Sequence, residues 1–176
     1  MSDTTSEGFL PTAHTGPAWE EARGQLTRPR KDNAPVEGFR AGMGVRDLIN
    51  RYAYALDQGD LDGLMEFFAD DCVINAPRGT LAGASAIRAH YERVISESDH
   101  RFHLLTNMIV RMGDDFGSAR VTTYFFGVLQ NHGEPLRTVG GLLADQVVKR
   151  DGQWKICARS VSIDVTLASG AVLAAR

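Results

Sequence analysis

His103 is the side chain of this sequence best suited to proton transfer. It opens the segment His-Leu-Leu-Thr-Asn, and strand alternation places it on one face with Leu105, Asn107 and Ile109. Histidine is the usual general base near neutral pH. A histidine among aliphatic side chains suits an apolar pocket. The alternative is a structural histidine whose nitrogens are satisfied by hydrogen bonds.

Two charged residues could assist such a base. Asp57 lies near the end of a predicted helix, at the edge of its apolar stripe, where a solvent-exposed aspartate is the plain alternative. Arg159 alternates with Val161 and Ile163 along the last predicted strand. Because an unpaired buried charge is costly, Arg159 needs a partner. That partner is a departing anion, a substrate carboxylate, or Asp57.

Two tyrosines are candidates for hydrogen bonding to a substrate oxygen. Tyr52 lies in the apolar stripe of the first helix, and Tyr124 lies on a central predicted strand. A buried phenol can donate a hydrogen bond to a substrate, or it can belong to the core with its hydroxyl satisfied. Asn107 is either structural or a contact for a polar substrate group. We predict no metal or cofactor, since HExxH, P-loop and GxGxxG motifs are absent.

The elements that must position these residues follow from hydrophobic periodicity. Helical spacing predicts helices over residues 45–57, 61–69 and 84–97, and Gly59 ends the first. Alternation predicts a short strand at 72–74 and long strands at 103–112, 119–130, 136–149 and 154–165. Helices followed by a long antiparallel meander indicate an α+β fold. A curved sheet with helices on one face leaves a cavity, which is where ligands bind.

The chain divides into three segments on this basis. Residues 1–43 are rich in glycine, proline and charge, so we predict a flexible segment, or an arm that wraps a neighbouring subunit through Phe9, Leu10 and Trp19. Residues 44–166 form the domain. The tail, 167–176, covers the pocket mouth or frays.

Composition narrows the class of protein. The 176 residues are 43% hydrophobic and 23% charged, with a net charge of -3, which is ordinary for a globular domain and offers no basic footprint for nucleic acid. The start of the chain does not read as a signal peptide, and no apolar run reaches the ~20 residues that span a membrane. We expect a cytoplasmic protein with Cys72 and Cys157 reduced.

Three segments of the sequence resemble one family. Residues 46–64, which include Arg46-Asp47, Tyr52 and Asp57, are similar to the opening of SnoaL-like (nuclear transport factor 2-like) domains. Residues 103–107 resemble a strand entry of that family, and 151–159 resemble its last hairpin. The likeness covers roughly the last three-quarters of the chain and implies a cone-shaped fold. Within the superfamily it is nearest to the scytalone dehydratase, bile-acid dehydratase and hexachlorocyclohexane dehydrochlorinase group.

The resemblance implies an activity and a site. Members of that group are cofactor-free lyases with an Asp–His dyad, which places Asp57 and His103 in those roles, and Arg159 matches an arginine that assists a departing anion. Tyr124 stands where scytalone dehydratase has a second histidine, and Tyr52 stands where the dehydrochlorinase has a lysine. We expect a dehydratase-type elimination on a mostly apolar ring compound, lined by the residues Leu105, Asn107, Val161 and Ile163.

Two other functions are open at this point. The same base could serve an isomerase or a cyclase, in which no group leaves, and the fold also serves as a ligand-binding or assembly module. Relatives commonly associate through the outer face of the sheet. We therefore predict a homo-oligomer, with a trimer preferred, through an apolar even-numbered strand face formed by Phe102, Leu104, Met108, Val110 and Met112.

Overall fold

The computed structural model describes residues 16–23 and 35–168. A short helix α1 (Pro17–Ala22) precedes the long helix α2 (Val36–Gln58), the short helix α3 (Leu61–Met65) and the helix α4 (Gly83–Glu97). The strands are β1 (Phe68–Ala76), β2 (Gly79–Ala82), β3 (Ser98–Met112), β4 (Ser118–Asn131), β5 (Arg137–Arg150) and β6 (Gln153–Ala168). None of the helices within the described ranges has the length and apolar character needed to cross a membrane.

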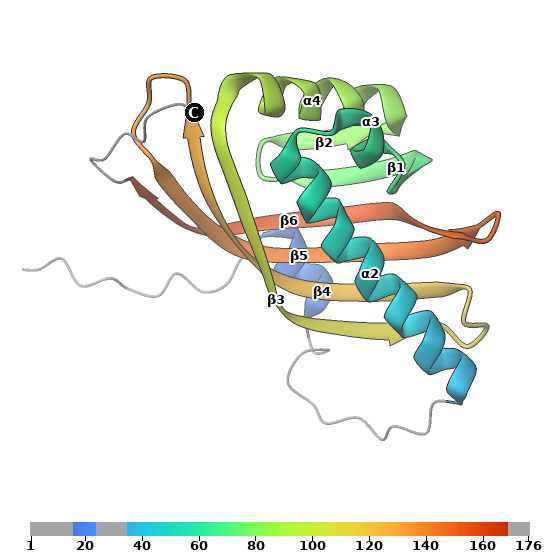
Figure 1. Cartoon of the computed structure of the whole chain (residues 1–176). Coiled ribbons are helices and arrows are strands. Elements are labelled where there is room, and N and C mark those ends of the chain that lie inside the picture. The colour runs from blue at the N-terminus through green and yellow to red at the C-terminus, as the bar shows by residue number, and fades with distance from the viewer. Residues whose placement is uncertain (1–15, 24–34, 169–176) are drawn as a thin grey trace, which may run out of the picture.

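The six strands form one curved sheet in the order β2-β1-β6-β5-β4-β3 (Figure 1). All neighbours are antiparallel except β1 and β6, which run parallel. The four long strands form the predicted meander, because the turns at 113–117, 132–136 and 151–152 each reverse the chain. The predicted α+β fold is thus confirmed.

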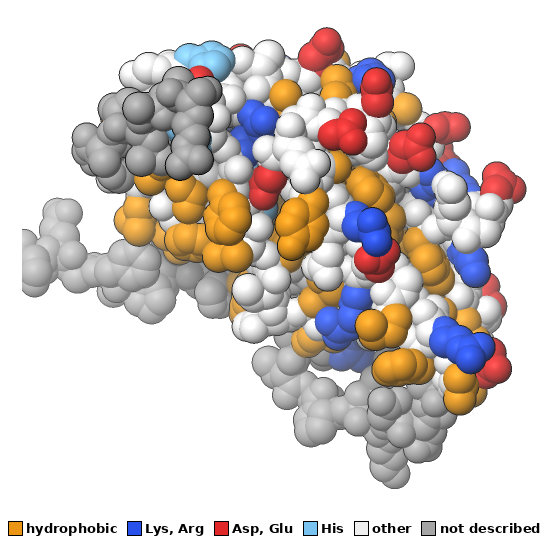
Figure 2. All heavy atoms as spheres, in the orientation of Figure 1, with side chains coloured by type: hydrophobic (Ala, Val, Ile, Leu, Met, Phe, Trp, Pro, Cys, Tyr) orange, Lys and Arg blue, Asp and Glu red, His pale blue; other side chains and the backbone are white. Residues whose placement is uncertain are grey.

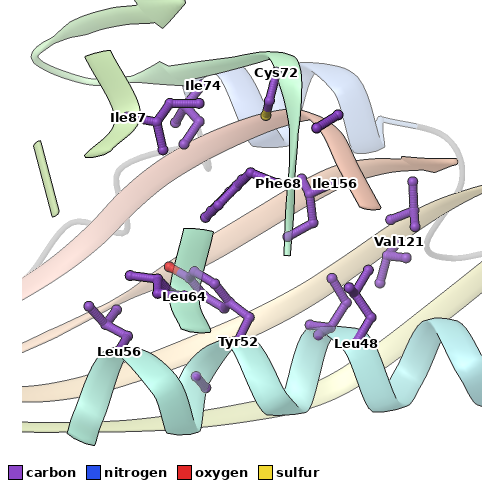
Figure 3. Close-up of a cluster of buried hydrophobic side chains, with 14 of the residues drawn as sticks. Leu48, Tyr52, Leu56, Leu64, Phe68, Cys72, Ile74, Ile87, Val121 and Ile156 are labelled. Carbon is purple, nitrogen blue, oxygen red and sulfur yellow. The ribbon is translucent and has the colours of Figure 1, made fainter. Parts of the chain in front are cut away.

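Helices α2 and α4 cover the concave face of the sheet and bury the main core. Leu48, Tyr52 and Leu56 rise from α2 toward Phe68 and Ile156 (Figure 3). Gly59, with a left-handed φ of 73°, ends α2 at the predicted place. Asp60 then caps α3 by accepting a hydrogen bond from the Gly63 N–H at 2.9 Å. This turn fixes the end of α2 against the sheet.

Helix α2 begins at Val36 rather than at the predicted Val45. The glycines of this stretch, which argued against a helix, allow close packing: a Cβ on Gly38 would meet the Phe116 ring at 2.9 Å, and one on Gly44 would meet the Trp154 ring at 2.8 Å. Helix α3 is shorter than the predicted 61–69. There the backbone turns to the sheet, where the Ile156 N–H donates to the Phe67 carbonyl at 2.8 Å.

Helix α1 lies on the face of the sheet opposite α2, where the sequence predicted no element (Figure 1). Ala18 and Ala22 are buried against Leu142 and Ala144 of β5. The Trp19 indole donates to Asp164 Oδ2 at 2.7 Å. Residues 17–22 of the predicted N-terminal segment 1–43 therefore pack against the sheet, because their small side chains let this turn of helix lie close to the strands. Residues 1–15 and 24–34 lie outside the residues that the structure describes.

A β-bulge interrupts β3 and corrects the predicted strand faces. The pairing of β3 with β4 shifts between Thr106 and Ile109, and Asn107 adopts a left-handed φ of 52°. Asparagine tolerates this conformation better than most residues. His103 and Leu105 therefore face the concave side, whereas Asn107 and Ile109 face the convex side. After the bulge, the even-numbered side chains pack against the core: Met108, Val110 and Met112.

A buried ion pair joins the two central strands. Arg159 of β6 donates to both carboxylate oxygens of Asp145 on β5, from Nε to Oδ1 at 2.6 Å and from Nη2 to Oδ2 at 3.0 Å. The side chains are 1% and 0% exposed. Because removing one partner leaves the other charge buried without compensation, this pair constrains the interior of the domain.

The ion pair makes a prediction about stability. We expect Arg159→Met to lower the free energy of unfolding by about 3–5 kcal/mol, since it strands the Asp145 carboxylate in the core. Urea denaturation of the variant measures the loss. The matched control is Arg150→Met, which breaks an exposed Arg–Asp pair with Asp71 elsewhere on the sheet. This control should leave stability nearly unchanged, and an equal loss in both variants would contradict the prediction.

Candidate active site

A carboxylate at the end of α2 binds one histidine through both of its oxygens. Asp57 Oδ1 lies 2.6 Å from His103 Nδ1, and Asp57 Oδ2 accepts the His103 backbone N–H at 2.8 Å. The two side chains are 17% and 16% exposed, so the pair is largely withdrawn from water. A carboxylate in this position favours the tautomer with the proton on Nδ1 and leaves Nε2 as the basic nitrogen.

The His103 ring lies against a glycine of the neighbouring strand. His103 pairs with Gly127 of β4, and a Cβ on Gly127 would lie 3.3 Å from His103 Cδ2 and 3.4 Å from Nε2. Glycine at this position therefore gives the ring room to lie close to the sheet. Within the described part of the chain, Nε2 has no hydrogen-bond partner. The ring is thus held by one nitrogen and has the other available.

A second polar cluster, separate from the Asp57–His103 pair, surrounds Tyr52 of α2. The Arg159 guanidinium, bound to Asp145, stacks over the Tyr52 ring with its Cζ 4.1 Å from the ring centre. Burial lowers the pKa of Arg159, but the Asp145 carboxylate, together with Tyr52 and Tyr91, outweighs burial and holds that pKa above its ordinary value. The predicted alternative of a structural pair between Arg159 and Asp57 is wrong, because Asp145 takes that place.

Tyr91 of α4 completes this cluster. Its hydroxyl lies 3.0 Å from that of Tyr52, and its ring stacks on Phe68 with centroids 5.7 Å apart. Burial raises the pKa of the Tyr91 phenol well above its ordinary value, and the nearby Arg159 guanidinium offsets only part of that rise. Tyr91 is therefore a neutral hydroxyl at physiological pH.

The remaining predicted site residues are divided between the two faces of the sheet. Leu105 and Val161 pack against the core on the concave side, and Ile163, two positions beyond Val161, is 48% exposed. Tyr124 lies on the convex face, where its ring is 5.9 Å from that of Trp19. It lines a hollow of about 110 Å³ together with the residues Asn107, Ile109, Thr122 and Leu142. Tyr124 and Asn107 therefore do not join His103, contrary to the sequence-based interpretation.

A model of the SnoaL-like domain matches residues 42–160, which is more than half of the 176 residues. The chain belongs to the SnoaL-like family. This confirms the resemblance carried by the helix opening, the His103 strand and the last hairpin.

Solved structures share the fold of this SnoaL-like domain. A candidate scytalone dehydratase from Novosphingobium aromaticivorans is 24% identical over 79% of this chain and 93% of that chain, with a TM-score of 0.71. A candidate aromatic ring hydroxylase from the same organism is 22% identical over 78% and 96%, with a TM-score of 0.70. A hexachlorocyclohexane dehydrochlorinase is 14% identical over 80% and 97%, with a TM-score of 0.72. At these identities the likeness concerns the fold.

Three residues of the candidate site were not predicted from the sequence. Asp145 carried a usable signal, since it is the one charge in the mostly apolar segment 142–148 and pairs with Arg159 across β5 and β6. Tyr91 carried a weaker one, four residues after the buried Ile87 on α4. Gly127 carried none, because its role depends on the pairing of β3 with β4. Among the described residues, no three His, Cys, Asp or Glu side chains gather to hold a metal ion.

The dyad geometry can be tested without a substrate. We expect proton NMR to show a strongly downfield Nδ1–H resonance, because a 2.6 Å contact with a carboxylate deshields that proton. Asp57→Asn should shift it upfield, and Gly127→Ala should move it by crowding the ring. Gly140→Ala, whose Cβ would make ordinary contacts at 3.6 Å, is the control. A Gly127→Ala spectrum identical to that of the wild type would contradict the proposed packing of the ring.

Proposed function

We propose that the protein is a cofactor-independent lyase that eliminates a group from a mostly apolar cyclic molecule, with His103 as general base. The observation that carries this proposal is the Asp57–His103 pair, in which both carboxylate oxygens are bound to one histidine and Nε2 is left available. Two of the similar structures bear the names of elimination enzymes, a dehydratase and a dehydrochlorinase.

The proposed reaction uses the two ring nitrogens differently. His103 Nε2 takes a proton from a ring carbon of the substrate, and the electron pair of that C–H bond forms a new C=C bond. The bond to the leaving group on the adjacent carbon breaks, and the group departs with its electron pair. Asp57 holds the imidazole in place and stabilises the positive charge that it gains. Tyr52 and Arg159, on the same concave face, stabilise charge that develops on the substrate.

The aliphatic surroundings support an apolar substrate. Leu105 and Val161 lie on the concave face with the dyad. An isomerase or cyclase would use the same base without loss of a group, so the mass of the product separates the two reactions.

The mechanism predicts the effect of removing the base. A screen of ring alcohols and ring enones for a change in absorbance supplies a substrate. We expect His103→Ala to lower kcat by about 10²–10⁴-fold, the usual contribution of general base catalysis. Asp57→Asn should keep the fold and lose much of the rate, because an amide stabilises imidazolium poorly.

The matched control is His100→Ala, which removes a histidine of the same strand at a position facing the convex side. It should retain the wild-type rate. Should His103→Ala turn over the substrate as fast as the wild type, the base assignment is wrong. Mass spectrometry of the product distinguishes elimination, which gives a lighter product, from isomerisation or cyclisation, which keeps the mass.

We also propose that the chain forms a homo-oligomer, with a trimer preferred, through the convex face of β3 and β4. Phe102 and Leu104 are 56% and 46% exposed, and Phe126, which pairs with Leu104, is exposed beside them. Figure 2 shows hydrophobic side chains gathered next to the upper part of β3. Such a patch favours contact with another apolar surface. Light scattering at micromolar concentration should report more than one subunit, and a monomer would contradict this proposal.

A further inference from the structure

Arg101 joins three elements that meet beside the candidate base. Its Nε donates to the Leu56 carbonyl of α2 at 3.1 Å, and its Nη1 donates to the Ile95 carbonyl of α4 at 3.0 Å. Nη1 also donates to the carbonyl and the Oγ of Ser98, at 2.9 Å and 2.7 Å. One guanidinium therefore binds the ends of both long helices and the first residue of β3, the strand that carries the base.

The ends of the two helices supply acceptors that suit a cation. The last carbonyls of a helix lack an N–H donor further along it, and the helix dipole places partial negative charge there. Leu56 and Ile95 each lie two residues before the last residue of their helix. Within the described part of the chain, no carboxylate pairs with Arg101. The carbonyls at the helix ends are therefore what hold this charge in place.

The contact with Leu56 bears directly on the carboxylate that supports the base. The Leu56 carbonyl belongs to the peptide unit that joins Leu56 to Asp57. Asp57 Oδ2 accepts the backbone N–H of His103, which follows Arg101 by two residues. These bonds close a ring that runs from α2 through the guanidinium to β3 and back through the carboxylate. The ring encloses the point where Asp57 Oδ1 meets His103 Nδ1 at 2.6 Å.

The glycine that ends α2 leaves room for the guanidinium. A Cβ on Gly59 would lie 3.0 Å from Arg101 Nη2, a tighter contact than side chains normally make. Arg101 and His103 also share the concave face of β3, because they are two residues apart in an unbroken stretch of pairing with β4. Arg101 therefore reaches the end of α2 from the same side as His103 does.

We propose that Arg101 is a positioning residue, which sets the Asp57–His103 contact by holding the end of α2 against β3. The inference rests on the proposed function for the catalytic use of that pair. A planar guanidinium presents Nε and Nη1 in fixed directions, toward α2 and α4 respectively, and the single nitrogen of lysine cannot reproduce this. Misplacement of a catalytic group by about 1 Å can cost about 100-fold in rate, so this hold on α2 matters for turnover.

The Nδ1–H resonance of His103 tests this role without a substrate. In proton NMR spectra, we expect Arg101→Met to move the resonance upfield and to speed its exchange with water, because a longer contact with the carboxylate deshields the proton less. Arg101→Lys keeps the charge but loses the fixed directions, so its resonance should also move upfield. A lysine variant with the wild-type resonance would contradict the role given to the guanidinium geometry.

The matched control is Arg46→Met. Arg46 also links α2 to β3, since its Nη2 donates to the Met108 carbonyl at 3.0 Å, but it does so beyond the bulge. Its loss should leave the His103 resonance unchanged. Circular dichroism checks that the variants are folded. An unchanged resonance in folded Arg101→Met, or an equal shift in Arg46→Met, would overturn the inference.

A milder variant keeps the test decisive if Arg101→Met does not fold. Ser98→Ala removes one acceptor of Arg101 and leaves the guanidinium in place. It should move the His103 resonance in the same direction by a smaller amount. A Ser98→Ala spectrum identical to that of the wild type would then count against the proposed positioning.

Turnover separates this inference from the base assignment. With a substrate in hand, Arg101→Lys should lower kcat about 10- to 100-fold with little change in KM, because the substrate contacts remain. If the resonance depends on Arg101 while turnover does not depend on His103, the positioning role stands and the proposed elimination falls. If turnover depends on His103 and the resonance is indifferent to Arg101, the reverse holds.

Discussion

Charge placed between a helix and a sheet is costly unless it meets a partner, and this constraint organises the concave face of the domain. Two carboxylates on this face, Asp57 and Asp145, are each bound through both oxygens. Asp57 binds the His103 backbone and ring, and Asp145 binds two nitrogens of Arg159. These bidentate contacts hold the His103 and Arg159 side chains in place. Two nitrogens of these side chains, His103 Nε2 and Arg159 Nη1, keep no hydrogen-bond partner among the described residues.

Helix α2 links the two halves of the candidate site. It carries Asp57 near its C-terminal end and Tyr52 about one and a half turns earlier, so the geometry of both clusters follows from the packing of one rigid element. Gly59 and Asp60 stop the helix directly after Asp57, which fixes the carboxylate opposite β3. A change in the position of α2 would move the Asp57 carboxylate and the Tyr52 phenol together.

Much of this structure could be predicted from local patterns in the sequence. Periodicity indicated α2, α4 and the four long strands, and the resemblance indicated the pairing of Asp57 with His103. Features that depend on contacts between distant segments were missed. The partner of Arg159 lies on another strand, and α1 depends on Leu142 and Ala144 for its burial. The bulge at Asn107 changed the predicted strand faces most, because one extra residue moves every later side chain of β3 to the opposite face of the sheet.

That bulge also gives β3 two independent roles. Its first half presents His103 and Leu105 to the concave side near the dyad, and its second half presents Val110 and Met112 to the same side as part of the core. The bulge at Asn107 is where the side chains of the strand exchange faces. The side chains of each half therefore alternate independently, and substitutions in the half that carries His103 can occur without changing which side chains of the other half face the core. Deletion of Asn107 would merge the two frames and force one half of the strand to turn its apolar side chains to the opposite face.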